Sequence, residues 1–209
     1  MEKVLVAGAT GTTGKKIVEI LSKSENYQPI AMIRKEEQKR QFEDQGIETR
    51  YGDLESNIDH IADNMDKVIF AAGSGGKKVY EVDQEGAKKM VDAGKRAKIS
   101  KFVMLSSMGA DKPEEASELK DYLKAKQNAD DYLRASANPY SIVRPGALTD
   151  DAGTGKIKVS RSLANSGSIS RDDVAKAMVF SLSNDIGLDA SFEMVSGETL
   201  IQDALNSIS

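Results

Sequence analysis

The chain has 209 residues, 39% of them hydrophobic, and a net charge of -4 from 29 Lys and Arg against 33 Asp and Glu. It can therefore bury one sizeable core and has no basic surplus for nucleic acid. Without cysteine and with one histidine, His60, it is excluded from disulfide bonding, thiolate catalysis and metal sites built on Cys or His clusters. No apolar run is as long as a membrane span and no signal-peptide pattern opens the chain, so we expect a cytoplasmic protein with a single domain over residues 1–209.

The first predicted elements are a strand, a glycine-rich loop and a helix. The apolar run 4–6 is typical of a buried strand, and residues 15–21 carry apolar side chains at helical spacing. Between them runs Gly8-Ala-Thr10-Gly11-Thr12-Thr13-Gly14. This spacing permits a tight turn, a close backbone approach and a helix–strand contact, so the amides that open the helix can bind a diphosphate. A purely structural glycine turn is the alternative, and the lack of a Gly-Lys-Ser/Thr ending disfavours a nucleoside triphosphate P-loop.

A second strand is predicted at residues 28–33, and it ends in Arg34 and Lys35. A protein that prefers NAD places an acidic residue here, which hydrogen-bonds the ribose 2′-hydroxyl and repels a 2′-phosphate. A guanidinium instead binds that phosphate in bidentate fashion, so this strand end favours NADP(H) over NAD(H). The alternative is a solvated charge run, because residues 34–40 carry both signs.

The third predicted strand, at residues 46–51, follows a short polar helix at residues 37–45. Asp53 and Leu54 come directly after this strand, at the edge of the sheet where nucleotides bind. The carboxylate can accept a hydrogen bond from an adenine amino group while the leucine covers the ring. Asp53 as a helix N-cap is an equally good interpretation.

The fourth predicted strand spans residues 66–73 and ends in Ala71, Ala72 and Gly73. Without bulky side chains, this strand end lets a ribose lie against the backbone. A flexible loop at residues 74–78 follows, and then an amphipathic helix at residues 82–98.

The fifth predicted strand spans residues 101–107 and ends in the hydroxyls of Ser106 and Ser107. The predicted helix 117–136 carries Tyr122 and Lys126 four residues apart, which places them on one helical face. An ammonium near the phenol favours its ionised form, so the tyrosine can give a proton to a carbonyl as a hydride arrives. Packing of an apolar stripe, with the lysine extending beside it towards water, is the alternative.

The last third of the chain begins with a predicted strand at residues 139–146, whose Pro145-Gly146 ending exposes backbone against which a nicotinamide can lie. Residues 147–169 are polar and predict a small substrate-side region with one strand at residues 156–159. The remaining predictions are a capping box at residues 170–173 that opens a helix to Leu182, a strand at residues 190–195 and a terminal helix at residues 199–208.

Together these motifs resemble, over nearly the whole chain, the atypical branch of the short-chain dehydrogenase/reductase superfamily that includes NmrA-like proteins and the biliverdin reductase B/flavin reductase type. The motifs occur in the family's order: the loop 8–14, Gly52-Asp53-Leu54, Phe70-Ala-Ala-Gly73, Ser106-Ser107, Tyr122-x-x-x-Lys126, Ile142-Val-Arg-Pro-Gly146 and Ser170-Arg-Asp-Asp-Val-Ala175. The resemblance implies a Rossmann-type, doubly wound, mostly parallel sheet flanked by helices.

The resemblance also implies roles for individual residues. It implies that Gly8, Thr10, Thr12 and Thr13 surround the diphosphate and that Arg34 binds the 2′-phosphate. It also implies that Asp53 and Leu54 contact the adenine, that residues 71–73 contact the adenosine ribose, and that Lys126 binds the nicotinamide ribose. Ser107 matches a hydroxyl near the nicotinamide in the flavin-reductase-like branch. An epimerase-like alignment instead places its catalytic Ser or Thr at Met108, where the hydroxyl is missing.

We therefore expect an NADP(H)-dependent oxidoreductase that acts on a small carbonyl, quinone, flavin or tetrapyrrole-like acceptor. Tyr122 is the expected acid, Lys126 tunes it and anchors the ribose, and Ser107 orients the acceptor. One alternative is a redox sensor that binds NADP(H) without turnover and reports to a partner protein. Another is an NAD-dependent epimerase or dehydratase, although the chain lacks a large C-terminal domain for a sugar nucleotide.

Overall fold

The computed structural model describes residues 1–164 and 166–208; residue 165 of the predicted substrate-side region and residue 209 lie outside the described part. The strands are β1 (Glu2–Ala7), β2 (Tyr27–Ile33), β3 (Glu48–Tyr51), β4 (Lys67–Phe70), β5 (Lys101–Leu105), β6 (Tyr140–Pro145), β7 (Ala147–Thr149), β8 (Lys156–Ser160), β9 (Ser168–Ser170), β10 (Ala190–Ser196) and β11 (Thr199–Leu200). The helices are α1 (Thr12–Ser22), α2 (Lys39–Glu43), α3 (Ala87–Ala97), α4 (Lys120–Ala135), α5 (Arg171–Phe180) and α6 (Ile201–Asn206).

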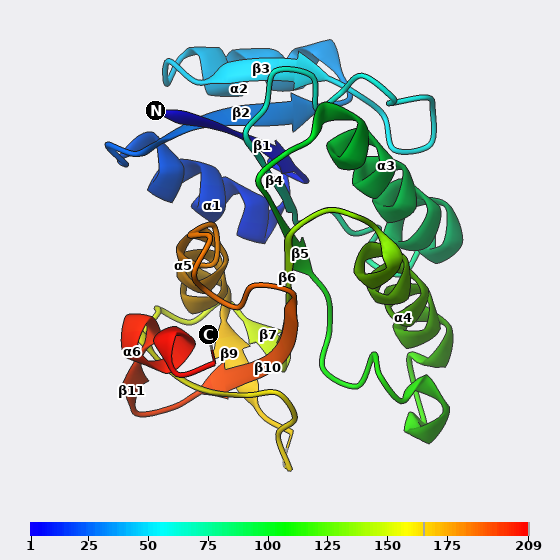
Figure 1. The fold of residues 1–209 in the computed structure, drawn as a ribbon, viewed down its shortest axis with the longest axis vertical. Coiled ribbons are helices and arrows are strands. Elements are labelled where there is room, and N and C mark those ends of the chain that lie inside the picture. Colours follow the sequence, from blue (N-terminus) through cyan, green and yellow to red (C-terminus); the bar gives the residue numbers. More distant parts are fainter. Residues whose placement is uncertain (165, 209) are drawn as a thin grey trace.

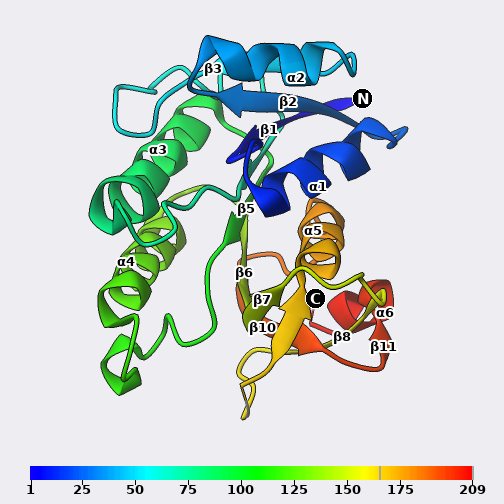
Figure 2. The same ribbon diagram turned by 180° about the vertical axis from the view of Figure 1, so that it is seen from behind.

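Helices cover both faces of a central sheet. Figure 1 shows α3 and α4 on one side of the sheet and α1 and α5 on the other, and Figure 2 shows the same layers from behind. In the described residues the sheet has nine strands in the order β11-β8-β10-β6-β5-β4-β1-β2-β3. Neighbours from β10 to β3 run parallel, and β8 pairs antiparallel with β10 and β11. The predicted doubly wound, mostly parallel fold is confirmed.

The strand order reverses beside β1. From β1 the chain proceeds to β2 and β3 on one side and then returns to β4 on the other side. The helices that follow β1 and β4 therefore leave on opposite faces, and a crevice remains between them at the carboxyl ends of the strands. This arrangement fixes where a ligand can bind.

The apolar runs are continuous because the strands are buried on both faces. In β1, Val4 and Val6 belong to the core under α1 and α5, whereas Leu5 and Ala7 belong to the core under α3 and α4. All four side chains are fully buried. A half-exposed strand would instead alternate apolar and polar residues.

Some predicted boundaries move. The predicted helix 82–98 begins earlier, as a π-helical segment (Val79–Gly86), and continues as α3. The predicted helix 37–45 is a 3₁₀ turn (Glu36–Gln38) followed by α2. The predicted strand 66–73 ends at Phe70, although the Ala71 amide still donates to the Ala7 carbonyl. A sequence pattern locates the ends of a helix or strand less accurately than its presence.

The region after β6 contains a second, two-stranded sheet that the sequence did not predict. β7 and β9 pair in parallel over three residues each, which is too short for a periodic pattern. Gly146 and Gly167 flank this pair, and a side chain at Gly146 would overlap the Gly167 carbonyl oxygen. The predicted strand at 156–159 is β8. Half of the predicted capping box at residues 170–173 is present, because the Ser170 hydroxyl accepts from the Asp173 amide. The Asp173 carboxylate instead accepts from the amides of Thr154 and Gly155, each at 2.8 Å.

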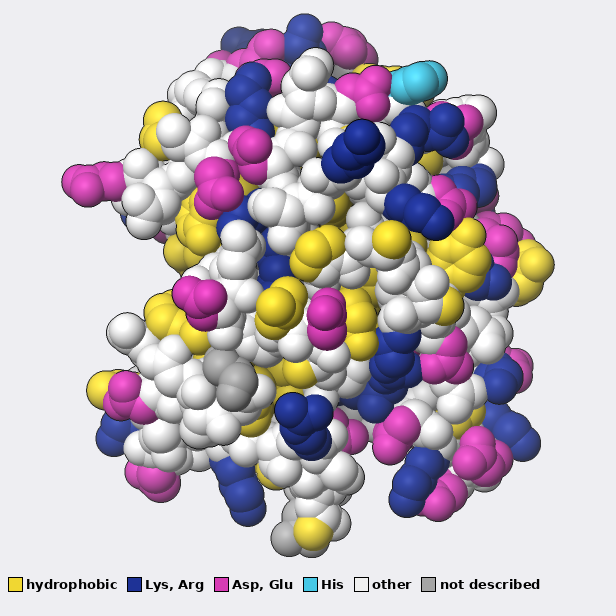
Figure 3. Space-filling model, in the orientation of Figure 1, with side chains coloured by type: hydrophobic (Ala, Val, Ile, Leu, Met, Phe, Trp, Pro, Cys, Tyr) yellow, Lys and Arg dark blue, Asp and Glu magenta, His cyan; other side chains and the backbone are white. Residues whose placement is uncertain are grey.

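The surface carries both signs of charge. On the face that Figure 3 shows, Lys and Arg side chains are interspersed with Asp and Glu side chains among the described residues. None of the helices in the described ranges combines the length and apolar character that crossing a bilayer requires.

Two lysine side chains are buried at the amino ends of β4 and β5. Lys67 is 2% exposed and Lys101 is fully buried. Their ammonium groups donate to the carbonyls of Leu182, at 2.8 Å, and Ile186, at 3.0 Å. Burial lowers the pKa of Lys101 to about 8. The chain after α5 is thus tied to the sheet by two buried cations.

Replacing Lys101 with methionine is expected to stabilise the fold at pH 7 by about 2 kcal/mol. The shift of the pKa from 10.5 to about 8 costs roughly 1.4 kcal/mol per unit, and the lost hydrogen bond offsets part of that gain. The Ile186 carbonyl still accepts from the Ser141 hydroxyl at 3.1 Å.

The pH dependence of stability distinguishes this effect from general repacking. Between pH 8 and 10.5 the unfolded wild type holds a proton that the folded chain has released, so its free energy of unfolding gains a component that rises with pH. Lys101→Met lacks this component. Urea unfolding at pH 7 and at about pH 9.5 measures both effects, with Lys95→Met on α3 as the exposed control. A Lys101→Met protein less stable than the wild type at pH 7 contradicts the prediction.

Candidate functional site

A cavity of about 630 Å³ lies at the carboxyl ends of the strands, beside the point where the strand order reverses. The predicted site residues that line it are Gly8, Thr10, Gly11, Thr12, Thr13, Arg34, Asp53, Leu54, Ala71, Ala72, Gly73, Ser106, Tyr122 and Lys126. Pockets of this size at this place in an open α/β sheet bind ligands. The fold therefore brings together residues that are spread over more than half of the chain.

Glycines shape the turn between β1 and α1. Gly8 has a φ of +86°, and a side chain there would lie 2.6 Å from the Ala71 backbone. Gly14 lies in the first turn of α1, where a side chain would overlap the Gly8 carbonyl oxygen. Gly14 does not line the cavity; it lets the helix start directly on the turn.

The amino end of α1 opens into the cavity. Gly11 precedes the helix and provides no side-chain cap, and its amide donates a hydrogen bond to the Gly8 carbonyl at 2.9 Å. Thr12 and Thr13, the first helical residues, line the cavity. The first amides of a helix have no intrahelical acceptor and the helix dipole favours anions there. The cradle, by which we mean residues 8–14, thus fits a diphosphate.

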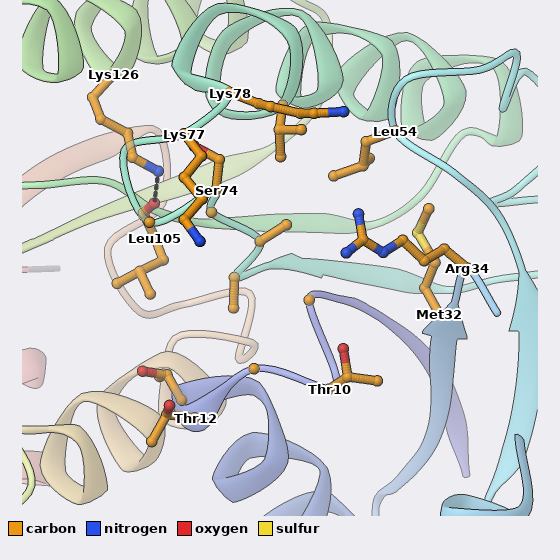
Figure 4. Close-up of a pocket in the computed structure, with 18 of the residues that line it drawn as sticks. Thr10, Thr12, Met32, Arg34, Leu54, Ser74, Lys77, Lys78, Leu105 and Lys126 are labelled. Carbon is orange, nitrogen blue, oxygen red and sulfur yellow. Dashed lines mark hydrogen bonds between the residues drawn. The ribbon is translucent and has the colours of Figure 1, made fainter. Parts of the chain in front are cut away.

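Arg34 lies at the end of β2 with its guanidinium in the cavity, beside Leu54 (Figure 4). The turn behind it is fixed by the Gln38 side chain, whose Oε1 accepts from the amides of Arg34 at 3.0 Å and Lys35 at 3.1 Å. The Lys35 side chain is not among those that line the cavity, and its ammonium lies 3.6 Å from Glu37. Of the two predicted cations, Arg34 is the one that lines the cavity.

Asp53 and Leu54 line the same end of the cavity as Arg34. The alternative interpretation of Asp53 as a helix N-cap is wrong, because a turn and not a helix follows it. Its Oδ1 accepts from the Glu55 amide of that turn at 3.0 Å. This bond leaves the second carboxylate oxygen available at the cavity.

Beyond β4, Asp83 supports the wall that Ala71, Ala72 and Gly73 form. Its Oδ2 accepts from both the amide and the hydroxyl of Ser74, at 3.1 and 2.6 Å. Its Oδ1 is buried without a hydrogen-bond partner in the described residues and lies 3.7 Å from the Lys126 ammonium. Asp83 was not predicted as a site residue; it is one of the buried residues of the π-helical segment.

Tyr122 and Lys126 lie together on α4, as their spacing predicts. The Lys126 ammonium is 5.6 Å from the centre of the Tyr122 ring and donates to the Leu105 carbonyl at 3.2 Å. Lys126 is 4% exposed. The alternative interpretation, in which this lysine extends along an apolar stripe to water, is therefore wrong: the ammonium is held inside the cavity wall.

Ser106 joins the cavity to a buried charge network. Its hydroxyl donates to Asp130 Oδ2 at 2.9 Å, and Arg144 donates to the same oxygen through Nε and Nη2, at 2.9 and 2.8 Å. Burial raises the pKa of the Asp130 carboxyl, which the bonds from Arg144 and Ser106 oppose. Because the serine proton points to Asp130, the serine oxygen is free to accept from a ligand.

Ser107 and Pro145 do not line the cavity. The Ser107 hydroxyl donates to the Met108 carbonyl at 3.3 Å, and the Met108 amide donates to the Pro145 carbonyl at 2.9 Å. The second of these bonds joins the chain after β5 to the end of β6. Arg171, for which the sequence carries no local signal, does line the cavity, because α5 packs beside α1 and brings its first residue there.

The model of a family described as NAD(P)H-binding matches residues 8–185. The chain belongs to this NAD(P)H-binding family. The NAD(P)H-binding chain is 38% identical over 214 residues to "uncharacterized sugar epimerase YhfK" of Bacillus subtilis (strain 168), covering 99% of this chain and 100% of the relative. A solved structure of a candidate NAD-dependent epimerase/dehydratase from Bacillus halodurans has a TM-score of 0.94 at 33% identity, covering 99% of this chain and 100% of that one. The oxidoreductase ylbE from Lactococcus lactis has a TM-score of 0.89 at 32% identity, covering 99% and 96%.

More distant solved structures share the fold of this NAD(P)H-binding chain. An anaerobillin reductase from Escherichia coli O157:H7 has a TM-score of 0.81 at 22% identity, covering 94% of this chain and 98% of that one. A candidate NADH-flavin reductase from Streptococcus pneumoniae has a TM-score of 0.78 at 20% identity, covering 94% and 100%. The predicted resemblance to atypical short-chain dehydrogenases/reductases is confirmed.

Proposed function

We propose that this chain is an NADP(H)-dependent oxidoreductase that transfers a hydride between the nicotinamide and a small carbonyl, quinone or flavin-like acceptor. The observation that carries the proposal is that the cradle of α1 and the pair Tyr122 and Lys126 line one cavity. The cradle is suited to the diphosphate of a dinucleotide, and the pair is suited to moving a proton. Membership of the NAD(P)H-binding family supports the nicotinamide cofactor.

Each group at the nicotinamide end has a task in this proposal. The bound cofactor supplies the hydride. Lys126, fixed by the Leu105 carbonyl, uses its remaining N–H groups on the nicotinamide ribose. Tyr122 donates a proton to the acceptor oxygen, and Ser106, which is on the cavity where the expected Ser107 is not, orients the acceptor. Leu148, in the region 147–169, also lines the cavity and supports placing the acceptor on that side.

Consumption of NADPH tests the proposal. The purified protein is incubated with NADPH and, separately, with aldehydes and ketones, quinones, and free flavins, and the loss of NADPH absorbance is followed. Oxidation that depends on one acceptor class supports the oxidoreductase. Tight NADPH binding with no consumption in any class contradicts it and favours the redox sensor.

The Arg34→Glu protein is expected to bind NADPH about 100-fold more weakly and NADH within a few fold of the wild type. The exchange removes a bidentate contact to the 2′-phosphate and adds a repulsive charge, an effect of about 3 kcal/mol at this position. Fluorescence titration with both dinucleotides measures it. Lys35→Glu is the matched control, because Lys35 does not line the cavity. Equal losses for NADPH and NADH in Arg34→Glu would show that Arg34 does not select the phosphate.

The names of two relatives favour a second candidate, an NAD-dependent epimerase or dehydratase. Such an enzyme regenerates its cofactor within each cycle, so it converts its substrate without net consumption of dinucleotide. Mass spectrometry of ligand retained on purification separates the two candidates. Tightly held NAD, together with turnover of a sugar nucleotide, would replace the oxidoreductase proposal.

A further inference from the structure

Residues 74–78 lie between β4 and the π-helical segment, and we name them the strap. All of them except Gly76 line the cavity. At one end, the amide and hydroxyl of Ser74 donate to Asp83, whose side chain is 1% exposed. At the other end, the Lys78 ammonium lies 2.6 Å from the Glu55 carboxylate. The strap is therefore anchored at Ser74 by a buried carboxylate and contacts Glu55 through Lys78, and Lys77, between these positions, lines the cavity.

Most of the positive charge on the cavity wall is already paired. The cationic residues that line it are Arg34, Lys77, Lys78, Lys126 and Arg171. Those with an acidic partner are Lys78 with Glu55, Lys126 with Asp83 at 3.7 Å, and Arg171 with Asp150 at 2.9 Å. Within the described ranges, Arg34 and Lys77 form no ion pair. These two side chains are the cations available to an anionic ligand.

The two available cations lie in different parts of the cavity. Figure 4 shows Arg34 beside Leu54 and on the side of Thr10, whereas the Lys77 ammonium extends from the strap into the open space on the side of Thr12. Thr12 is the first residue of α1 and belongs to the cradle, so Lys77 faces the cradle from the opposite wall. An anion between them meets helix amides on one side and an ammonium on the other.

We propose that Lys77 binds the diphosphate bridge of the cofactor and closes the cradle from the strap side. This inference rests on the proposed function, which places a dinucleotide in the cavity. It divides the anionic groups of NADP(H) between the two unpaired cations, with the 2′-phosphate at Arg34 and the diphosphate at Lys77. A lysine suits the second position, because a flexible stem lets a compact charge follow either phosphate.

The expected contribution of Lys77 is moderate. The side chain is exposed before binding, so ordering its stem and screening by solvent reduce the gain from a charge-assisted contact. We expect Lys77→Gln to raise the Kd for NADPH about tenfold and to reduce the salt dependence of binding. If Lys77 binds the diphosphate, Lys77→Gln should raise the Kd by the same factor for any ligand that contains this diphosphate bridge.

Three ligands distinguish binding of the diphosphate from binding of the 2′-phosphate. NADPH contains both anionic groups, ADP-ribose contains the diphosphate without the 2′-phosphate, and adenosine 2′-monophosphate contains the 2′-phosphate without the diphosphate. Their Kd values are measured by direct titration with NADPH and by competition for the other two. The variants are Lys77→Gln, Arg34→Gln and, as a control for loss of one positive charge, Lys95→Gln on the exposed face of α3. Circular dichroism and thermal unfolding confirm that each variant is folded.

The proposal expects Lys77→Gln to weaken NADPH and ADP-ribose about equally and to leave adenosine 2′-monophosphate unchanged, with the reverse selectivity for Arg34→Gln. Unchanged binding of all three ligands by Lys77→Gln overturns it. Loss of adenosine 2′-monophosphate binding assigns Lys77 to the 2′-phosphate and overturns it too, as does a higher KM for the acceptor with unchanged nucleotide Kd. If the wild type binds no nucleotide, the proposed function itself fails. If the wild type binds nucleotide and the Lys77→Gln protein binds it equally well, only the role of Lys77 fails.

Discussion

The Tyr122→Phe protein is expected to reduce a carbonyl acceptor with a kcat lowered by about 100-fold to 10,000-fold, the usual contribution of a positioned general acid. The exchange removes the hydroxyl and keeps the ring beside Lys126, whose ammonium lies 5.6 Å from the ring centre. Nucleotide binding should change little, because the cradle and Arg34 are untouched. Steady-state kinetics at saturating NADPH, with separate NADPH titration, measures both quantities.

Tyr132→Phe is the matched control for this experiment. Tyr132 lies on the same helix, but it is outside the cavity lining and its hydroxyl donates to Asp92 at 2.9 Å. Its kcat should equal that of the wild type. A Tyr122→Phe protein that reduces carbonyl acceptors at the wild-type rate would remove Tyr122 from the mechanism. Reduction of a flavin is a weaker test, because hydride transfer to flavin can proceed without an acid from the protein.

The Gly14→Ala protein is expected to lose about 3 kcal/mol or more of stability and to bind NADPH at least 100-fold more weakly. A methyl group there would overlap the Gly8 carbonyl oxygen and would lie 2.7 Å from the Gly8 carbonyl carbon and 3.0 Å from the Ala9 Cα. These atoms are backbone and cannot rotate away. The start of α1 must move, which displaces the amides of the cradle. Urea unfolding and calorimetry with NADPH measure the two losses.

Gly11→Ala is the matched control, because it places the same methyl group at another glycine of the cradle. Gly11 has φ -76° and ψ 168°, which alanine adopts without strain, and a methyl group there would lie 3.2 Å from the Gly8 carbonyl oxygen. Its loss of stability should stay below about 1 kcal/mol. Similar stabilities for Gly14→Ala and Gly11→Ala would show that the helix start tolerates displacement, contrary to the close contact seen at Gly14.

The central strands and the cradle were predictable from sequence because their signals are local. A strand buried on both faces is an apolar run, as in β1, and the glycines at 11 and 14 report backbone contacts with Gly8, a near neighbour in the chain. The contact of Gly8 with the Ala71 backbone is long-range, so only the glycine itself was visible in the sequence. The Tyr122 and Lys126 pair was equally accessible, because four residues of helix determine which side chains meet.

Other parts of the site depend on contacts that no short window contains. Asp83 meets Lys126 across 43 positions, and Ser106 meets Asp130 across 24. Arg171 reaches the cavity because α5 packs on α1. The sequence could place two serines at the end of β5 but not decide between them, since a strand end one residue earlier or later turns a different hydroxyl into the cavity.

The hydrogen bonds from the buried ammonium groups of Lys67 and Lys101 to carbonyls after α5 have a consequence for biosynthesis. Their carbonyl acceptors lie 115 and 85 residues further along the chain, whereas every cavity residue comes before them, the last being Arg171. A growing polypeptide therefore contains the residues that line the cavity while the Lys101 ammonium still lacks its carbonyl acceptor, and burying such a group unpaired is costly. The Lys67 ammonium already has the Glu2 carboxylate of β1 at 3.3 Å. We therefore expect removal of the segment after α5 to weaken ligand binding in the cavity, although none of the described lining residues comes from that segment.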